Sequence, residues 1–494
     1  MGRMRVCVLA VFSIISFTIG LTWTTFSSVP DVAAALFPAL SPASLTWTLN
    51  ANNLSQLLTA PFAIYLLARP PIGRTGLRLT VLLGTFFLLV QSLLWAIATL
   101  DPSAPWVVAL LIMGGTAGGS ASAFTQGCVS HLSAAWFPPK TRGTVTSVAY
   151  ASQYAGQALA YLTALPICTA ADLATLLRIE AAIAIGLMIA ALAFPDGPAR
   201  ERLAHVSTAN SEPEVEETHD GTTGRAAHAL SEPLCQSTST SPPCPSRLER
   251  LLPLCTALEP GQARTCALVG IYAAWLNGFY SGWATTLPLM WPATPTAALS
   301  AGTSACATSG WKRAVTHPGN LLGFVAGVAY PLGGALAGVI ADRYFVHQLR
   351  RFLLACMALA FLAFAVIVAC RPPLTWLPPS NASTNHTHGG ADEGVLITFL
   401  PSVFVGGAVL GATMPTAMEL LAEVGFPIPP GASANAVVAL LQISATVITS
   451  LVAILSPEAM NALMLLAIGL CTLLLLPVQE RYRRCESERL SARR

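Results

Sequence analysis

Residues 6–28 read VCVLAVFSIISFTIGLTWTTFSS, an apolar stretch that contains no charged side chain. A helix of about 20 apolar residues is long enough to cross the roughly 30 Å hydrocarbon core of a bilayer. The stretch follows Met1 to Arg5 and is not followed by a clear small-residue cleavage site. We therefore interpret it as a first membrane span and not as a signal peptide.

Eleven similar runs follow along the chain. With 54% hydrophobic and only 10% charged residues among 494, the composition excludes a soluble multidomain enzyme, a disordered chain and a secreted disulfide scaffold. The sequence predicts an all-α membrane protein with twelve transmembrane helices in two pseudo-symmetric six-helix bundles. The spans are expected at 6–28, 45–68, 79–99, 106–133, 144–166, 174–194, 264–288, 318–341, 352–370, 395–415, 433–455 and 459–477.

Composition also divides the chain into four segments. An N-terminal six-helix bundle is expected over 1–195 and a C-terminal one over 263–478, followed by a basic cytoplasmic tail over 479–494. Residues 196–262 between the bundles are rich in Glu, Ser, Thr and Pro. Such a segment cannot bury an apolar core, so we expect a disordered cytoplasmic linker.

The distribution of basic residues predicts the orientation. Cytoplasmic loops carry an excess of Lys and Arg, and here one set of loops and both termini hold most of them. The other loops hold only Lys312, Arg313 and Arg371, so both termini are expected to be cytoplasmic, in the plasma membrane or an endomembrane. The sequons at Asn381 and Asn385 then lie outside, where glycosylation takes place.

The remaining composition gives little sign of other partners. The net charge of +3 and the lack of a basic run with aromatic residues argue against nucleic-acid binding. No CxxC pair occurs, so we expect no metal and no cofactor. Cys168 and Cys306 both fall outside in this topology and are compatible with a disulfide, but two free thiols are the favoured interpretation. The partners we expect are a small-molecule substrate and the lipid bilayer, and the protein is expected to be monomeric.

The two halves repeat in sequence position, as they do in many transporters. Trp23 lies 16 residues after Cys7, near the start of the first span, and Tyr280 lies 16 residues after Arg264, which opens span seven. In the same way Gln153 follows Gly143 by 10 residues in span five, and Gln442 follows Gly431 by 11 in span eleven. Two aromatic residues and two glutamines therefore occupy matching depths of matching helices.

These four residues have a structural alternative. Tryptophan and tyrosine also anchor helices at the lipid interface, and glutamine also holds helices together by hydrogen bonds. Because a buried amide is costly in hydrocarbon without partners, a side chain of this kind faces a cavity or a neighbouring helix. The pairing across the two halves favours a substrate site made by Trp23, Gln153, Tyr280 and Gln442.

A second group of residues suggests a gate at the cytoplasmic ends of the helices. Gly334, Gly338, Asp342 and Arg343 follow one another at a spacing that allows close helix packing, with an Asp–Arg pair to latch the bundle ends. The matching loop over 68–78 keeps glycines and arginines but lacks the aspartate. Glu419 and Glu423 lie one turn apart near the inner end of span ten and are interpreted as a structural cap on this gate.

The six-plus-six arrangement with this loop motif resembles the major facilitator superfamily, and more narrowly its feline leukaemia virus subgroup C receptor-related (FLVCR) transporters. The likeness covers most of both bundles but not the linker or the outer loops. It rests on Trp23 with Val29-Pro30-Asp31, Gly76-Leu77-Arg78, Trp136-Phe137-Pro138, Gly278 to Ser281, Glu419 to Pro427, Gly431-Ala432-Ser433 and Gln442.

This resemblance implies transport of choline or ethanolamine, with haem proposed as a substrate for some members. In choline-transporting members an aromatic pair from the first and seventh helices encloses the quaternary ammonium, and glutamines from the fifth and eleventh line the same cavity. Carried over residue by residue, it implies a substrate site at Trp23, Tyr280, Gln153 and Gln442. The missing aspartate in the loop over 68–78 departs from the family pattern.

Charged residues in the spans bear on ion coupling. Arg178 and Glu180 are expected near the outer start of span six, away from mid-membrane, where a proton-relay carboxylate would lie. We therefore expect a facilitative carrier. The alternatives are a haem or porphyrin transporter, with His386, His388 and Cys244 as weak candidate ligands, and a non-transporting receptor. No catalytic motif occurs, so an enzyme is not expected.

Overall fold

The structure is a computed structural model of the whole chain. It describes residues 2–68, 73–137, 139–195, 259–291, 318–345, 348–370, 391–426, 428, 430–480 and 482. All statements below concern these residues. The predicted linker, most of the basic tail and the longest predicted outer loops lie outside them.

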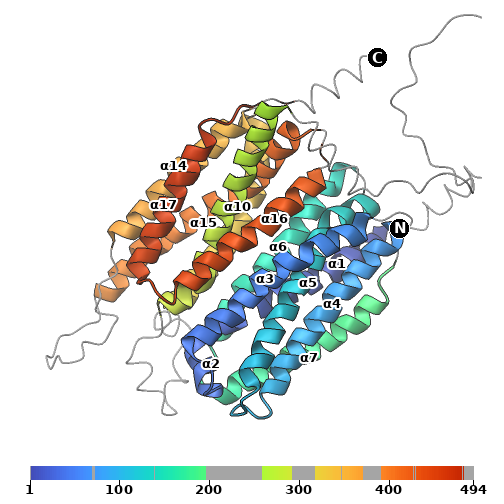
Figure 1. Cartoon of the computed structure of the whole chain (residues 1–494), viewed down its shortest axis with the longest axis vertical. Coiled ribbons are helices and arrows are strands. Elements are labelled where there is room, and N and C mark those ends of the chain that lie inside the picture. Colours follow the sequence, from blue (N-terminus) through green and yellow to red (C-terminus); the bar gives the residue numbers. More distant parts are fainter. Residues whose placement is uncertain are drawn as a thin grey trace, which may run out of the picture.

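The described part of the N-terminal half contains six long helices and one short helix (Figure 1). The short helix α2 directly follows the Val29 N-cap and begins with Pro30, a residue suited to the first helical turn because its missing N–H is not needed there. The helices are α1 (Gly2–Ser28), α2 (Pro30–Leu36), α3 (Pro42–Ala68), α4 (Gly73–Ala98), α5 (Val107–Trp136), α6 (Pro139–Ala164) and α7 (Ala170–Leu192).

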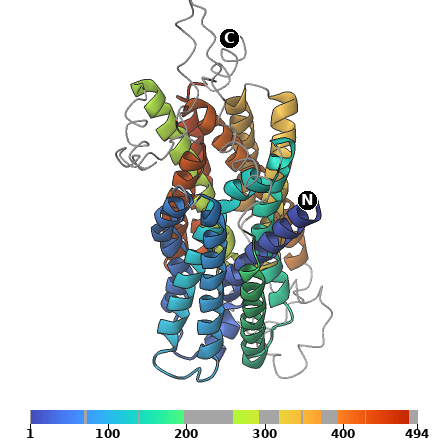
Figure 2. The ribbon, with the colours of Figure 1, turned by 90° about the vertical axis from the view of Figure 1, so that its right-hand side faces the viewer.

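The C-terminal half contains six further long helices, which run roughly side by side with those of the first half (Figures 1 and 2). The all-helical, twelve-span fold class is thus confirmed for the described residues. The helices are α10 (Pro260–Met290), α13 (Pro318–Tyr344), α14 (Leu349–Ala369), α15 (Ala391–Val424), α16 (Pro430–Leu451) and α17 (Pro457–Leu475).

Nine of the twelve long helices are apolar enough over their described residues to cross a membrane by length and composition alone. The other three are α3, α6 and α10. Each of these contacts the opposite half: α3 packs against α16, α6 against α13, and α10 against α1.

Each half has its own apolar core. The buried residues of two clusters all fall within residues 8–194, and those of the other two fall within 269–478. Because the cores are separate, the halves can rotate against each other without opening either core.

Glycines allow the same pair of helices to pack closely within each half. A Cβ added at Gly20 in α1 or at Gly156 in α6 would overlap the backbone of the other helix, at Gln153 and Phe17 respectively. In the second half a Cβ at Gly278 in α10 would overlap Ser444 in α16. The first and fifth long helices of each half therefore pack backbone to backbone, as the pseudo-symmetry predicts.

Two arginines occupy equivalent places at the ends of the bundles. Arg78 in α4 donates from Nη2 to the carbonyl oxygen of Leu192 at 2.9 Å, and Arg350 in α14 donates from Nε to that of Leu475 at 3.1 Å. In each half the third long helix thus caps the last carbonyls of the sixth. A cation at a helix C-terminus satisfies free carbonyls and interacts favourably with the helix dipole.

Candidate functional site

Trp23 lies in the second half of α1 and is only 9% exposed. It follows the first residue of α1 by 21 positions, and Tyr280 follows the first residue of α10 by 20. At about 1.5 Å per residue the two positions differ in depth by roughly one residue. Both side chains are buried, which is not the environment of a lipid-facing anchor.

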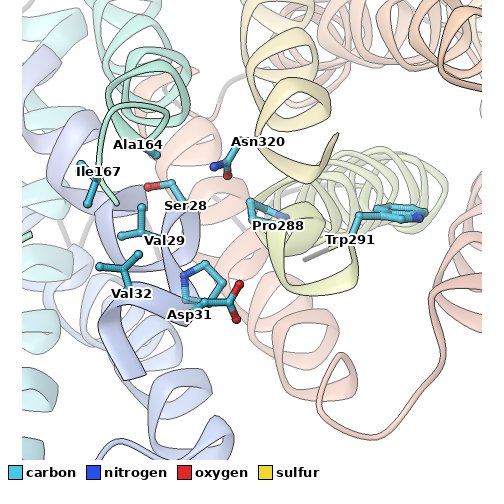
Figure 3. Close-up of a pocket in the computed structure, with 10 residues that line it drawn as sticks. Ser28, Val29, Asp31, Val32, Ala164, Ile167, Pro288, Trp291 and Asn320 are labelled. Atoms are coloured by element: carbon cyan, nitrogen blue, oxygen red, sulfur yellow. The ribbon is translucent and has the colours of Figure 1, made fainter. Parts of the chain in front are cut away.

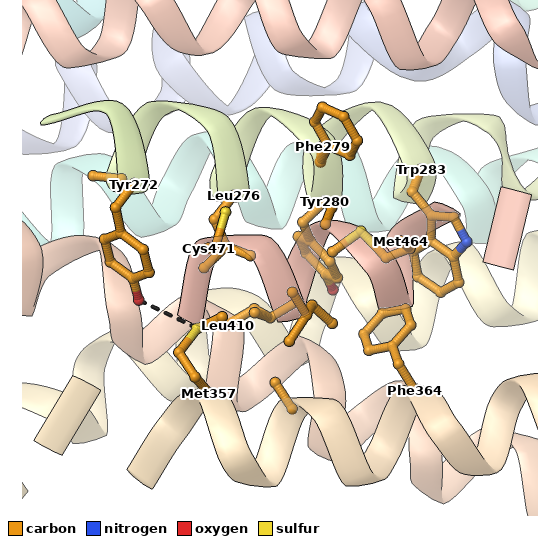
Figure 4. Packing of buried hydrophobic residues seen from close by; sticks show 14 of the residues in the cluster. Tyr272, Leu276, Phe279, Tyr280, Trp283, Met357, Phe364, Leu410, Met464 and Cys471 are labelled. Atoms are coloured by element: carbon orange, nitrogen blue, oxygen red, sulfur yellow. Dashed lines mark hydrogen bonds between the residues drawn. The ribbon is translucent and has the colours of Figure 1, made fainter. Parts of the chain in front are cut away.

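Tyr280 is held from the side of the C-terminal half. Its hydroxyl donates to the carbonyl oxygen of Ala326 in α13 at 3.2 Å, and the residue is 3% exposed. Its ring stacks on Tyr330 with centroids 5.3 Å apart and 12° between the planes. Figure 4 shows Tyr280 among Leu276, Met464 and other buried side chains of this half. One face of the Tyr280 ring is therefore covered by Tyr330.

Tyr330 extends this contact to the other half. Its hydroxyl donates to Oδ1 of Asn277 at 2.7 Å, and its ring lies 5.0 Å from that of Tyr154 in α6. The rings of Tyr154, Tyr330 and Tyr280 thus form a continuous row from the N-terminal half into the C-terminal one. Sequence reasoning missed Tyr154, Tyr330 and Asn277. The spacing of Asn277, one turn before Tyr280 in an apolar helix, was the one local signal.

The two glutamines are buried within their own halves. Gln153 is 4% exposed and donates from Nε2 to Oγ of Ser122 in α5 at 3.1 Å. Gln442 in α16 is 6% exposed, and among the described residues its side-chain amide makes no hydrogen bond. Gln442 therefore has an amide group available for a ligand, while that of Gln153 is partly engaged.

The four residues lie near two close helix contacts, one in each half. Gln153 lies where α6 meets α1 at Gly20, three residues before Trp23. Gln442 lies next to Leu441, whose carbonyl oxygen meets Gly278, two residues before Tyr280. Among the described residues no contact joins Trp23 to Tyr280 directly.

Further contacts between the two halves lie toward one end of the molecule, the end where α1 finishes, which we call the far end. There Asn50 in α3 donates from Nδ2 to Oγ of Ser450 in α16 at 2.8 Å. The hydroxyl of Tyr161 in α6 donates to the carbonyl oxygen of Ala284 in α10 at 3.2 Å. A Cβ built on Gly327 would lie 3.0 Å from that of Ala158. These contacts close the far end.

A small pocket lies at the closed far end, between the end of α1, the beginning of α2 and the end of α10 (Figure 3). It is partly open to solvent, and its cavity volume is about 40 Å³. Asp31 and Asn320 supply its polar lining side chains together with Ser28, and Oδ1 of Asn320 has no hydrogen-bond partner among the described residues. Figure 3 shows the Asp31 carboxylate directed toward Pro288 on the other half. Within the described part of the chain, no three metal-ligating side chains gather around a common point.

Glu180 corrects one expectation. It is the eleventh of the 23 residues of α7, so it lies at the middle of this span and not near its outer start. The prediction was wrong because the helix begins at Ala170, four residues earlier than the apolar run suggested. Glu180 is 1% exposed, and the hydroxyl of Thr25 in α1 donates to its Oε1 at 2.8 Å.

The expected gate residues lie where α13 and α15 end. The close approach between these helices is made at Gly333 and Gly411, where an added Cβ would overlap the opposite backbone. A Cβ on Gly334 would meet Gly411 at 3.3 Å, and one on Gly338 would meet nothing within 4 Å. Arg343 is exposed, with its guanidinium 5.8 Å from the ring of Tyr344. The Asp342 side chain lies outside the described part.

Glu419 is exposed and Glu423 is half-buried near the end of α15, and both have interaction partners. The gate assigned to these residues therefore stays a prediction. The sequons at Asn381 and Asn385, the histidines at 386 and 388, and Cys244 all lie outside the described residues. Cys168 is disulfide-bonded, so the favoured expectation of a free thiol there is wrong. Its partner, like Cys306, lies outside the described residues.

Comparison with known proteins agrees with this architecture. The chain is similar to the xylose transporter XylE from E. coli in a partially occluded inward-open conformation, with 13% identity, a TM-score of 0.57 and 96% of each chain covered. The inward-open conformation of the same transporter gives 13% identity, a TM-score of 0.59 and 97% coverage of each chain. A structure titled D-xylose-proton symporter gives 14% identity, a TM-score of 0.56, and covers 96% of this chain and 98% of that one. These identities establish likeness of fold alone.

A comparison with curated protein sequences finds no match. The family model described as Major Facilitator Superfamily matches residues 7–424, which is most of the chain and includes all but the last two long helices. Membrane transport is the activity of this family, and the fold of the described residues is that of a transporter and not of an enzyme. The chain is therefore a member of the Major Facilitator Superfamily.

Proposed function

We propose that the protein is a facilitative, alternating-access carrier of a small organic cation such as choline or ethanolamine, and that it belongs to the FLVCR-related branch of its family. The observation that carries this proposal is the burial of Trp23 and Tyr280 at matching depths of α1 and α10. These two helices contact each other between the halves. Burial speaks against the alternative role of both rings as lipid anchors.

The chemistry of the four residues suits an organic cation. A quaternary ammonium has no proton to donate, so ring faces hold it, at about 0.5–2 kcal/mol for each ring when water is excluded. The side-chain amide of Gln442, which is buried and makes no hydrogen bond among the described residues, would then bind the hydroxyl group shared by choline and ethanolamine. Weak contacts distributed over two halves let the carrier release its substrate once the halves separate.

The closed far end supplies one state of an alternating-access cycle. Opening it requires loss of the Asn50–Ser450 and Tyr161–Ala284 hydrogen bonds, at roughly 0.5–1.5 kcal/mol for each. It also separates the ring of Tyr154 from that of Tyr330. Costs of this size are small enough for thermal motion to overcome and large enough to define a closed state. In our proposal the far end is extracellular or lumenal, and the monomer is the transporting unit.

The test is uptake of labelled choline and ethanolamine into liposomes that contain the purified protein. We expect Trp23→Ala and Tyr280→Ala each to raise KM about 2- to 30-fold, which is the range of the cation–π energy expressed as affinity. The matched control is Trp275→Ala, since Trp275 lies in α10 like Tyr280 but is 41% exposed. Unchanged KM in both site variants would exclude the aromatic site.

The driving force is tested in the same liposomes. A facilitative carrier accumulates a cation in response to membrane potential, and an imposed pH difference alone produces no accumulation. Accumulation driven by a pH difference without a potential would contradict the facilitative mechanism. The liposomes are also tested for haem uptake. If haem uptake survives both aromatic substitutions and neither choline nor ethanolamine is taken up, the substrate is a porphyrin and not an organic cation.

A further inference from the structure

Glu180 is a buried acid in the middle of a membrane span that the proposed cation site does not use. It is 1% exposed, and its Oε2 atom has no hydrogen-bond partner among the described residues. Acidic residues in this position are costly and rare in membrane proteins, and those that occur commonly take part in ion or proton binding. Glu180 is therefore a candidate for ion or proton binding.

The contact between Glu180 and Thr25 contains more acceptors than protons. The Thr25 hydroxyl lies 2.8 Å from Oε1 of Glu180 and 3.1 Å from the carbonyl oxygen of Leu21. One hydroxyl has one proton and can satisfy only one of these oxygens well. If Glu180 is protonated, its own O–H donates to Thr25, and Thr25 donates to Leu21. If it is ionised, one of the two acceptors loses its donor.

No charged side chain compensates an ionised Glu180 among the described residues. Its helix, α7, packs against α1, α2 and α4. The charged residues of these three helices lie near helix ends, and so do the other charged residues of α7 apart from Arg178. Arg178 is exposed, two positions before Glu180 and thus on another side of the helix, and donates from Nε to Oγ1 of Thr99 at 3.2 Å. The other charged or titratable residues on these helices are Arg3, Arg5 and Cys7 on α1, Asp31 on α2, Arg74 and Arg78 on α4, and Asp172 on α7.

A strip of buried polar groups continues from this contact across the N-terminal half. Thr22, one turn before Thr25 in α1, donates to Oε1 of Gln91 in α4 at 3.4 Å. A Cβ placed on Gly118 would lie 2.6 Å from that oxygen and 2.7 Å from Oδ1 of Asn52. Nε2 of Gln91 and Oδ1 of Asn52 have no hydrogen-bond partner among the described residues. Buried polar atoms of this kind are satisfied by internal water, which also carries protons.

We propose that Glu180 is a proton-binding site whose occupancy controls the conformation of the carrier. In the conformation closed at the far end the carboxyl group holds its proton. When it ionises, the proton passes to water, and the carboxylate left in an apolar core has to be hydrated. Hydration separates α7 from α1 at Thr25, two residues after Trp23, and so displaces the helix that carries one half of the proposed cation site.

This switch needs no net proton transport, so it is independent of the facilitative mechanism and of the substrate. Its first test is infrared spectroscopy of the protein in lipid, titrated from about pH 5 to pH 9. The wild type should show the carbonyl stretch of a buried protonated carboxyl group, which disappears as the pH rises. Glu180→Gln should lack this titrating band. Asp172→Asn is the matched control, since Asp172 is the acid that caps the same helix, and it should keep the band.

The second test follows the far end itself. Genetically encoded nitroxide labels at Trp47 and Ile454, both exposed and on opposite halves, report its separation by pulsed electron paramagnetic resonance. In the wild type the short-distance population should fall as the pH rises, and in Glu180→Gln it should stay at its low-pH level. A pH response of Glu180→Gln equal to that of the wild type, or a titrating band that survives the substitution, would overturn the proposal.

If Glu180→Gln does not fold, Thr25→Val provides the decisive variant. It removes the hydroxyl that donates to Glu180 and keeps the acid in place. A hydrogen bond to an ionised acceptor is about twice as strong as a neutral one, so its loss should move the midpoint of the titrating band to higher pH. An unchanged midpoint in Thr25→Val would show that the titrating group is not Glu180.

Discussion

The contact between α1 and α6 at Gly20 makes a sharp prediction about helix packing. A Cβ added at Gly20 lies 2.8 Å from the carbonyl carbon of Gln153 and overlaps the carbonyl oxygen. Carbon atoms pack best at about 3.5–4.0 Å, so Gly20→Ala must push α6 away by roughly 0.7 Å or more. Because the obstacle is backbone, no side-chain rotation relieves it. The displaced segment includes Gln153, one of the four proposed site residues.

The magnitude follows from a comparison with Gly186 in α7. A Cβ at Gly186 would meet nothing within 4 Å. Gly186→Ala and Gly20→Ala both gain about 1 kcal/mol of helix propensity, but only Gly20→Ala places its new Cβ against a neighbouring backbone. Overpacking costs about 1–3 kcal/mol, and this is the expected difference in unfolding free energy between the two variants. For a bundle of 150–250 residues it corresponds to a Tm difference of roughly 2–12 °C.

The assay is thermal unfolding of both purified variants in the same detergent, followed by choline uptake in liposomes. Gly20→Ala should unfold at lower temperature than the wild type, and Gly186→Ala at the same or slightly higher temperature. Equal Tm values for the two variants would refute the reasoning, because they would mean that α1 and α6 do not meet backbone to backbone at Gly20.

Three further outcomes are expected. Thr169→Ala removes the capping box of α7 and should lower the unfolding free energy by about 1 kcal/mol, measured by chemical denaturation; a change below 0.3 kcal/mol, roughly the scatter of surface substitutions, would contradict the cap. Asn50→Ala and Ser450→Ala should each weaken far-end closure by about 0.5–1.5 kcal/mol, and the double variant should weaken it by no more than either single one, because both remove the same hydrogen bond. A double-mutant cycle that shows full additivity would contradict this hydrogen bond. Peptide mapping without reductant should recover Cys168 in a cross-linked peptide. Six other cysteines are free, and of the remaining five only Cys306 falls on the outer side in the predicted topology, so Cys306 is the expected partner. Alkylation of Cys168 without reduction would contradict the disulfide.

The internal repeat predicted from the sequence has a counterpart in how the helices pack. Spacing alone placed Trp23 and Tyr280 at matching depths, and the glycine contacts at Gly20 and Gly278 now give the two helices matching neighbours. The row of three tyrosines had no such signal. Tyr154 and Tyr330 are separated by 176 positions and come from different halves, so their contact depends on how α6 meets α13.

Some properties of this protein are local, and the sequence by itself determined them. The length and apolar character of each run decide whether it crosses a bilayer, and the even number of spans with its internal repeat indicates the superfamily fold. Other properties depend on which helices become neighbours. The depth of Glu180, its contact with Thr25 155 positions away and the closed far end appeared only in the tertiary structure. The physical reason is that hydropathy is a sum over one segment, whereas a hydrogen-bond partner is chosen by the packing of several.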